Sequence, residues 1–205
     1  RPVRAGLSHR GPLYPRRAMT QRKRLATVWL AGCSGCHMSF LDLDEWLLEL
    51  AELAEIVYSP IASDVKIYPD AVDIALVEGA VGNSDNLALL REVRANTTTL
   101  VSFGDCALSA NVPGMRNPMG DPQAVLRRAY LDLADAGSQL PGDAQWPGDA
   151  QLPQLLPRAL PIHELVPVEV YLPGCPPSAA CIRVVVEALL RDERPQLAPE
   201  QIRFG

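Results

Sequence analysis

Short β-prone apolar runs alternate with segments of helical spacing along most of this chain, and that alternation constrains its fold more than any other feature. The runs expected to be strands are 24–31, 55–59, 73–79, 97–104 and 166–174. The first of them is mostly apolar, as expected of a strand that is covered on both faces. Strands that alternate with helices predict an α/β fold, an open parallel sheet with helices on both faces.

Three segments between or after these runs have the spacing of helices. They are 40–54, 84–94 and 178–190. In the first, apolar residues recur at helical spacing while acidic residues fill the other side. The other two begin at residues that cap helices well, Asn83–Ser84 and Ser178.

Charge is unevenly distributed along the 205 residues. Residues 1–24 carry eight of the 19 Lys and Arg residues and no acid, so the remainder holds 11 basic side chains against 24 acidic ones. We expect 1–23 to be a disordered basic leader, because it lacks the apolar segment of a secretory signal, and 24–205 to be one domain. The acidic body argues against nucleic acid as the main partner.

No apolar run in the sequence approaches the length that spans a bilayer. Without a membrane segment or an export signal, the sequence predicts a cytoplasmic protein with no membrane partner.

One stretch, 134–162, breaks the alternation of strands and helices. It is rich in Pro, Gly, Asp and Gln, and the pentapeptide PGDAQ occurs twice in it, at 141–145 and 147–151. Because such a composition builds no packed core, we expect a surface excursion or a partly disordered loop there.

Five cysteines in a chain without an export signal argue against a disulfide framework. Four of them follow predicted strands: Cys33 and Cys36 the first, Cys106 the fourth and Cys175 the last. The carboxyl ends of parallel strands share one edge of the sheet, so these thiols can converge there. Cys181 differs, because it lies on the apolar stripe of the helix predicted at 178–190 and is expected to be buried.

Three kinds of site would use such thiols. A redox dithiol explains Cys33 and Cys36 and leaves Cys106 and Cys175 unused. A structural zinc site usually takes two close ligand pairs, whereas this chain offers one pair and two distant single cysteines. A [4Fe–4S] cluster needs four thiolates around a body larger than one ion, which ligands from three loops suit better. The spacing favours the cluster and leaves the other two open.

Four short motifs, taken in order, resemble the signatures of [NiFe]-hydrogenase small subunits. They are CSGC (33–36), VEGAV (77–81), FGDCA (103–107) and PGCPP (173–177). The resemblance implies a flavodoxin-like domain with an iron–sulfur site at the carboxyl edge of its strands. The ligands that it implies for one [4Fe–4S] cluster are Cys33, Cys36, Cys106 and Cys175.

The same motifs supply candidate supporting residues. The Ser34 hydroxyl would hydrogen-bond near the cluster or assist proton movement, or serve only to form a turn. Glu78 would touch a partner or simply end its strand, and Gly174 stops the last strand. His37 is expected to donate a hydrogen bond to backbone or sulfur, or to be exposed, rather than to bind metal.

The pattern is most similar to the small subunit of soluble NAD-reducing hydrogenases, because of CHMSFLDLDE (36–45) and because only 30 residues follow Cys175. That resemblance implies a relay, inactive as an isolated chain, between the nickel–iron centre of a large subunit and diaphorase subunits that carry further Fe–S clusters and FMN and reduce NAD⁺. The related complex I subunit has adjacent cysteines in its first motif, so C-x-x-C argues against a quinone-coupled role.

Two alternatives of other classes stay open at this point. One is a flavodoxin-like module that binds FMN at the same edge, although four cysteines there would obstruct a flavin site and no phosphate-binding loop is present in the sequence. The other is a structural zinc-binding scaffold.

Overall fold

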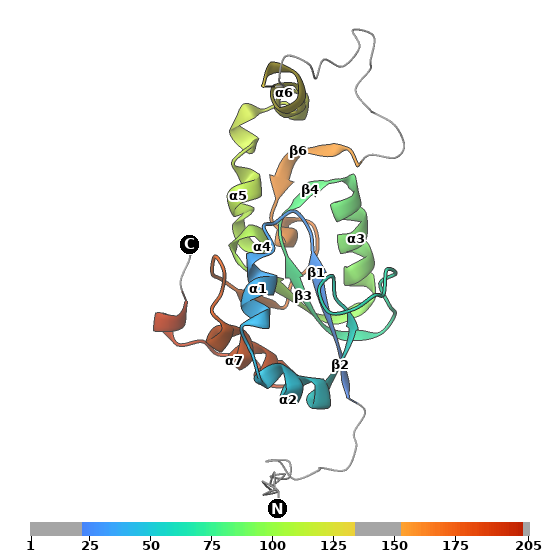
Figure 1. Ribbon diagram of the computed structural model, residues 1–205, viewed down its shortest axis with the longest axis vertical. Coiled ribbons are helices and arrows are strands. Elements are labelled where there is room, and N and C mark those ends of the chain that lie inside the picture. The colour runs from blue at the N-terminus through green and yellow to red at the C-terminus, as the bar shows by residue number, and fades with distance from the viewer. Residues whose placement is uncertain (1–21, 134–152, 203–205) are drawn as a thin grey trace, which may run out of the picture.

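Five parallel strands form the central sheet, in the order β2-β1-β3-β5-β7 (Figure 1). Their bounds are β1 Lys23–Trp29, β2 Ala54–Tyr58, β3 Val72–Glu78, β5 Thr97–Phe103 and β7 Val170–Leu172. Numbered along the chain within this sheet, the order is 2-1-3-4-5, which is that of flavodoxin-like folds. The structure, a computed structural model, describes residues 22–133 and 153–202, and it confirms the predicted parallel α/β sheet.

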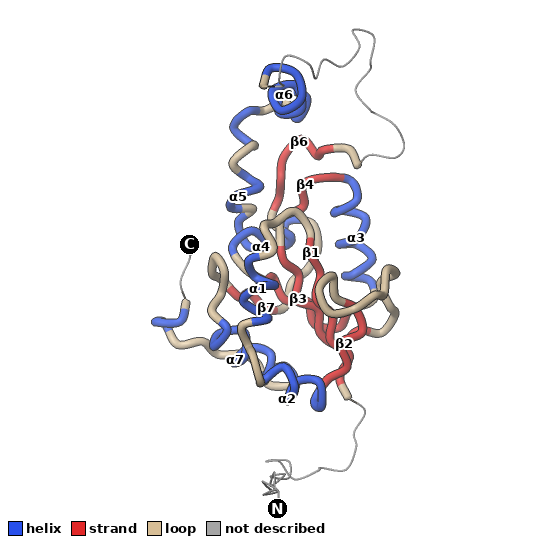
Figure 2. The backbone as a smooth tube through the Cα atoms, viewed as in Figure 1, coloured by secondary structure: helices blue, strands red, loops and turns tan. Residues whose placement is uncertain are grey.

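Helices cover both faces of the sheet (Figure 2). One face packs against α1 (Gly35–Leu41), α2 (Trp46–Leu53) and α7 (Ala179–Leu190), and the other against α3 (Ser84–Ala95) and α4 (Asp105–Ser109). Successive strand residues point to opposite faces, so Leu76 joins the first core cluster and Val77 the second. Apolar residues on both faces explain why the strands read as continuous apolar runs.

Shorter elements follow α4 and complete the fold. They are α5 (Asn111–Gly114), α6 (Pro122–Arg127), a π-helical turn (Arg128–Asp132), and 3-10 turns at Asn117–Met119, Ile162–Glu164 and Pro199–Gln201. Two of the predicted helix starts are confirmed, because Asn83 caps α3 by accepting from the Asn86 N–H, and Ser178 caps α7 by accepting from the Cys181 N–H. No helix among the described residues has the length and hydropathy that crossing a bilayer requires.

The single helix predicted at 40–54 is wrong, because two helices and a strand start occupy that range. Helix α1 ends at Leu41, α2 begins at Trp46, and Ala54 already belongs to β2. Between the helices Asp44 has φ 48°, a left-handed conformation that changes the direction of the chain and that Asp tolerates better than most residues. Leu43 in this turn is buried, so the turn preserves the apolar spacing on which the prediction rested.

The stretch predicted to be irregular at 134–162 ends in regular structure. Strand β6 (Leu155–Leu160) pairs antiparallel with β4 (Val81–Asn83), and Ile162 beyond it is fully buried. The Asn117 side chain holds the strand from the other side, donating to the Ala159 carbonyl at 2.9 Å and accepting its N–H at 2.8 Å. The repeated pentapeptides lie outside the described residues, as does nearly all of the predicted leader 1–23.

Candidate functional site

The loops that follow β5 and β7 are joined at the carboxyl edge of the sheet. The Asp105 N–H donates to the Gly174 carbonyl at 3.0 Å, and the Gly174 N–H donates to Asp105 Oδ1 at 2.7 Å. Asp105 is buried. This reciprocal pair fixes the residues next to Cys106 and Cys175 relative to each other.

The loops that follow β1 and β3 are joined at the same edge. Ala31 and Ala80 exchange backbone hydrogen bonds of 2.9 and 2.7 Å. A Cβ on Gly32 would lie only 3.2 Å from the Gly79 Cα, so the two loops are in close contact. The C-x-x-C segment therefore starts from a loop that is tied to the neighbouring strand.

The structure brings Cys33, Cys36, Cys106 and Cys175 into one neighbourhood. Cys33 and Cys175 are exposed, whereas Cys36 in α1 and Cys106 in α4 are buried. Burial raises the pKa of Cys36, and the charges of Glu78 and of the other three thiols raise it further. Because charge effects weaken with distance, this influence is consistent with the four thiols lying at the same edge of the sheet.

Cys36 packs tightly against Gly104. A Cβ on Gly104 would lie 2.2 Å from Cys36 Sγ, and Gly104 has φ +82°, which favours glycine. Only glycine at this position leaves room for the Cys36 sulfur. The buried thiol of α1 thus packs directly on the loop that carries Cys106.

Cys33 lies where backbone amides can support a thiolate. The Gly35 N–H donates to Cys33 Sγ at 3.4 Å. Ser34 between the two cysteines has φ 67°, and its hydroxyl donates to the Cys33 carbonyl at 2.5 Å. Ser34 thus forms a turn between the two cysteines, and the roles near a cluster considered for its hydroxyl stay predictions.

Gly174 has a steric reason to be glycine. Its φ is +136°, and a Cβ there would lie 2.5 Å from the Pro177 Cα. It therefore allows the tight turn that presents Cys175 after β7. Cys181, in contrast, lies on the buried side of α7, in the core. Its N–H donates to the Ser178 hydroxyl, and its thiol contacts the same hydroxyl at 3.1 Å.

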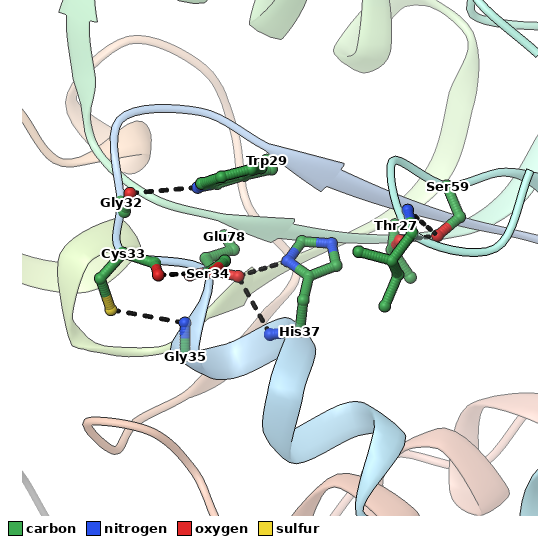
Figure 3. Close-up of polar contacts among 10 residues, drawn as sticks. Thr27, Trp29, Gly32, Cys33, Ser34, Gly35, His37, Ser59 and Glu78 are labelled. Atoms are coloured by element: carbon green, nitrogen blue, oxygen red, sulfur yellow. Dashed lines mark hydrogen bonds and ion pairs between the residues drawn. The ribbon is translucent and has the colours of Figure 1, made fainter.

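Sequence reasoning missed the polar pair beneath the cysteine loop. His37 is fully buried, and Glu78 ends β3 with its carboxylate turned inward rather than toward solvent (Figure 3). Glu78 Oε2 accepts the His37 backbone N–H at 3.1 Å and contacts the His37 ring nitrogen Nδ1. His37 was expected to be exposed, or to donate a hydrogen bond to backbone or to sulfur. Both expectations are wrong for its ring, which is buried and contacts the Glu78 carboxylate. No local pattern links two residues 41 positions apart.

The burial of the thiols predicts an order of alkylation in the metal-free full chain. Cys33 and Cys175 should react with iodoacetamide before Cys36 and Cys106, because the latter are buried and burial raises the pKa of each, which lowers the thiolate fraction. Peptide mass spectrometry after timed quenching measures the order. A chain unfolded in guanidinium is the control, and reaction at Cys36 first would contradict the prediction.

Comparisons with known proteins find similar chains among hydrogenase subunits. The protein family described as NADH ubiquinone oxidoreductase, 20 Kd subunit, matches residues 33–189. The delta subunit of the NAD-reducing hydrogenase HoxS of Cupriavidus necator is 36% identical over 180 residues, covering 87% of this chain and 83% of that one.

Other relatives are longer than this chain. One subunit of the F420-non-reducing hydrogenase of Methanothermobacter marburgensis is 33% identical over 181 residues, which is 87% of this chain and 57% of the relative. This chain thus spans little more than half of that protein.

Among solved structures, a chain in the crystal structure of an NAD⁺-reducing [NiFe]-hydrogenase in the H2-reduced state superposes with a TM-score of 0.82. It is 38% identical, and the match covers 90% of this chain and 100% of that chain. A [NiFeSe]-hydrogenase chain of Desulfomicrobium baculatum, 14% identical with a TM-score of 0.51, shares the fold.

Proposed function

This chain belongs to the family of [NiFe]-hydrogenase small subunits, and from that premise we propose that it is a one-cluster electron relay. In this proposal Cys33, Cys36, Cys106 and Cys175 bind one [4Fe–4S] cluster, which supplies one-electron redox chemistry. The chain positions that chemistry between the nickel–iron centre of a large subunit and a diaphorase module with further Fe–S clusters and FMN.

The observation that carries the proposal is that four cysteines follow β1, β5 and β7 at one edge of the sheet, and that the other three thiols act electrostatically on Cys36. Soft thiolate ligands suit iron–sulfur clusters. Within the described ranges, no three His, Cys, Asp or Glu side chains are grouped closely enough to hold a single metal ion. A cluster is larger than one ion, so its four ligands stand farther apart than the ligands of zinc.

The electrostatics of the thiols also support a cationic occupant. Burial raises the pKa of Cys36 and of Cys106, and the neighbouring thiols add to the effect on both. Four thiolates without metal would repel one another, whereas iron would compensate their charge and drive their deprotonation. The Gly35 N–H at Cys33 Sγ is a hydrogen-bond donor of the kind that tunes cluster potentials.

The proposed electron acceptor of the complex is NAD⁺. The HoxS delta subunit and the chain of the NAD⁺-reducing enzyme are covered over 83% and 100% of their lengths, whereas the relative from the F420-non-reducing hydrogenase is covered over 57%. The C-x-x-C spacing of Cys33 and Cys36 favours a hydrogenase over a quinone-coupled complex, whose small subunit resembles this one but has adjacent cysteines.

A relay of this kind works only inside a complex. One [4Fe–4S] cluster normally carries one electron, while H2 oxidation and NAD⁺ reduction each involve two. The anaerobically reconstituted full chain should therefore contain about four irons, without nickel or flavin, and should neither take up H2 nor oxidise NADH. Metal analysis, the optical spectrum and both assays measure these properties.

Addition of the large subunit and the flavin-bearing partner should then give H2-dependent NAD⁺ reduction. Reduction of another carrier but not of NAD⁺ would overturn the proposed acceptor alone. Resolved flavin bands, stoichiometric zinc without iron, or activity of the isolated chain would overturn the relay.

A further inference from the structure

Helix α1, which carries Cys36, has no capping hydrogen bond from the side chain of the residue before it. The first N–H groups of a helix lack partners within it, and the residue before the helix usually supplies one. Ser34 occupies that position here, but its side chain makes no capping bond and donates to the Cys33 carbonyl instead.

Glu78 supplies the missing acceptor from the neighbouring strand (Figure 3). Its Oε2 accepts the backbone N–H of His37, at the position that a capping side chain would satisfy, at 3.1 Å. The same oxygen contacts His37 Nδ1, and the two side chains are 2% and 0% exposed. Two contacts to one residue fix both the backbone of α1 and the ring that follows Cys36.

Glu78 is well placed to act as an anchor. It ends β3 in the middle of the sheet, in register with Trp29 of β1 and Phe103 of β5. Its carbonyl also accepts the Leu30 N–H at 2.8 Å. Because strands on both sides hold its backbone, Glu78 cannot shift easily if α1 moves.

The position of Cys36 depends on where α1 sits. Its Sγ lies against Gly104 with no room for a methyl group between them, so a shift of the helix would change the sulfur's distance from the loop of Cys106. We propose that Glu78 is a positioning residue, which holds the first turn of α1 through His37 and thereby sets the place of Cys36 among the four thiols. The contact between Glu78 and His37 is present in the structure without a cluster. Its effect on a cluster rests on the proposed function.

Amide hydrogen exchange in the metal-free full chain tests the contact. Loss of a capping acceptor should accelerate exchange over residues 35–41 about tenfold in Glu78→Ala. Glu78→Gln should stay near the wild type, because its amide oxygen accepts the same two hydrogen bonds.

The matched control is Glu169→Ala. Glu169 Oε2 likewise accepts one backbone N–H, that of Leu100, and one side-chain donor, Arg94, both at 2.8 Å. It precedes β7, at the end of the sheet opposite the cysteines. Its loss should leave exchange at 35–41 unchanged.

Electron paramagnetic resonance of the reduced, reconstituted chain tests the consequence for Cys36. We expect an altered line shape and lower iron retention in Glu78→Ala, and the wild-type line shape in Glu78→Gln and Glu169→Ala. A line shape altered in both alanine variants would point to a general loss of stability rather than to a shift of Cys36.

Each outcome decides the proposal. Unchanged exchange at 35–41 in Glu78→Ala, equal acceleration in Glu169→Ala, or equal acceleration in Glu78→Gln would overturn it. Should Glu78→Ala not fold, Glu78→Asp is the second variant, because its side chain is shorter by one methylene and its carboxylate lies farther from His37. Hydrogen exchange of the same amides, 35–41, must then be faster than in the wild type. A wild-type chain that binds no cluster would overturn the proposed function, and the exchange experiment would still decide the role of Glu78.

Discussion

Replacing Cys175 by serine is expected to remove most of the iron from the reconstituted chain, whereas replacing Cys181 by alanine should leave the iron in place. Cys175 is exposed in the loop after β7, next to the hydrogen-bonded pair Gly174–Asp105 and within the electrostatic reach of Cys36. Serine is a poor substitute because a [4Fe–4S] cluster is normally held by four thiolates.

Cys181 belongs to a different environment. It is buried in the core with Ile182 and Val185, so its loss costs packing, about 1 kcal/mol in the free energy of unfolding. Iron content, the optical spectrum and chemical unfolding distinguish the two effects. Equal loss of iron from both variants would show that the cysteines have been assigned incorrectly.

Gly104→Ala is expected to reduce both the stability of the chain and its iron binding. The new Cβ would lie 2.2 Å from Cys36 Sγ, and the backbone has φ +82°. Overpacking of this kind costs about 1–3 kcal/mol, and an alanine held in such a backbone adds about 1–3 kcal/mol of strain. Because Cys36 must move to relieve the clash, iron binding should fall along with stability.

Gly120→Ala is the control for Gly104→Ala. Gly120 has φ +77°, but nothing lies within 4 Å of the position that its added methyl group would take. It should therefore show the backbone strain alone, with iron content like that of the wild type. Urea unfolding of the metal-free chains and iron analysis of the reconstituted ones measure the difference. Equal stability and equal iron in the two variants would show that Cys36 does not pack on Gly104 in solution.

The sequence predicted those elements whose signals are local. The runs that became β1, β2, β3 and β5 are apolar on both faces, and the caps of α3 and α7 stand next to the helices that they start. The last strand is shorter than expected, Val170–Leu172 within 166–174. Val166 instead donates its N–H to the carbonyl of Ile162 in the preceding 3-10 turn, and Val166 and Val168 pack in the second core cluster.

What the sequence could not predict depends on contacts between distant residues. Helical spacing continued through Leu43 although Asp44 turns the chain. Strand β6 forms because Asn117 and β4, both far away in sequence, supply its partners. The pair His37–Glu78 has no sequence signature, because it joins a helix to the end of a different strand.

For the candidate site, the sequence predicted which cysteines follow strands of one sheet, and in the structure Cys33 and Cys36 follow β1, Cys106 follows β5 and Cys175 follows β7, whereas Cys181 lies in the core. That these four cysteines bind a cluster stays a prediction. The identity of the metal is a matter of chemistry that neither spacing nor backbone geometry fixes. It therefore stays a prediction that iron and sulfide analysis can decide.

The strand order also bears on when the proposed cluster could be assembled in the cell. Strand β7 is the last strand of the parallel sheet to leave the ribosome, and within the described residues it pairs in that sheet with β5. Cys33, Cys36 and Cys106 are synthesised before Cys175, and thiols in a nascent chain are open to oxidation or to a wrong metal. If these four cysteines bind the proposed cluster, its assembly is completed only after β7 has been made and paired, so that polypeptide folding precedes maturation of the subunit.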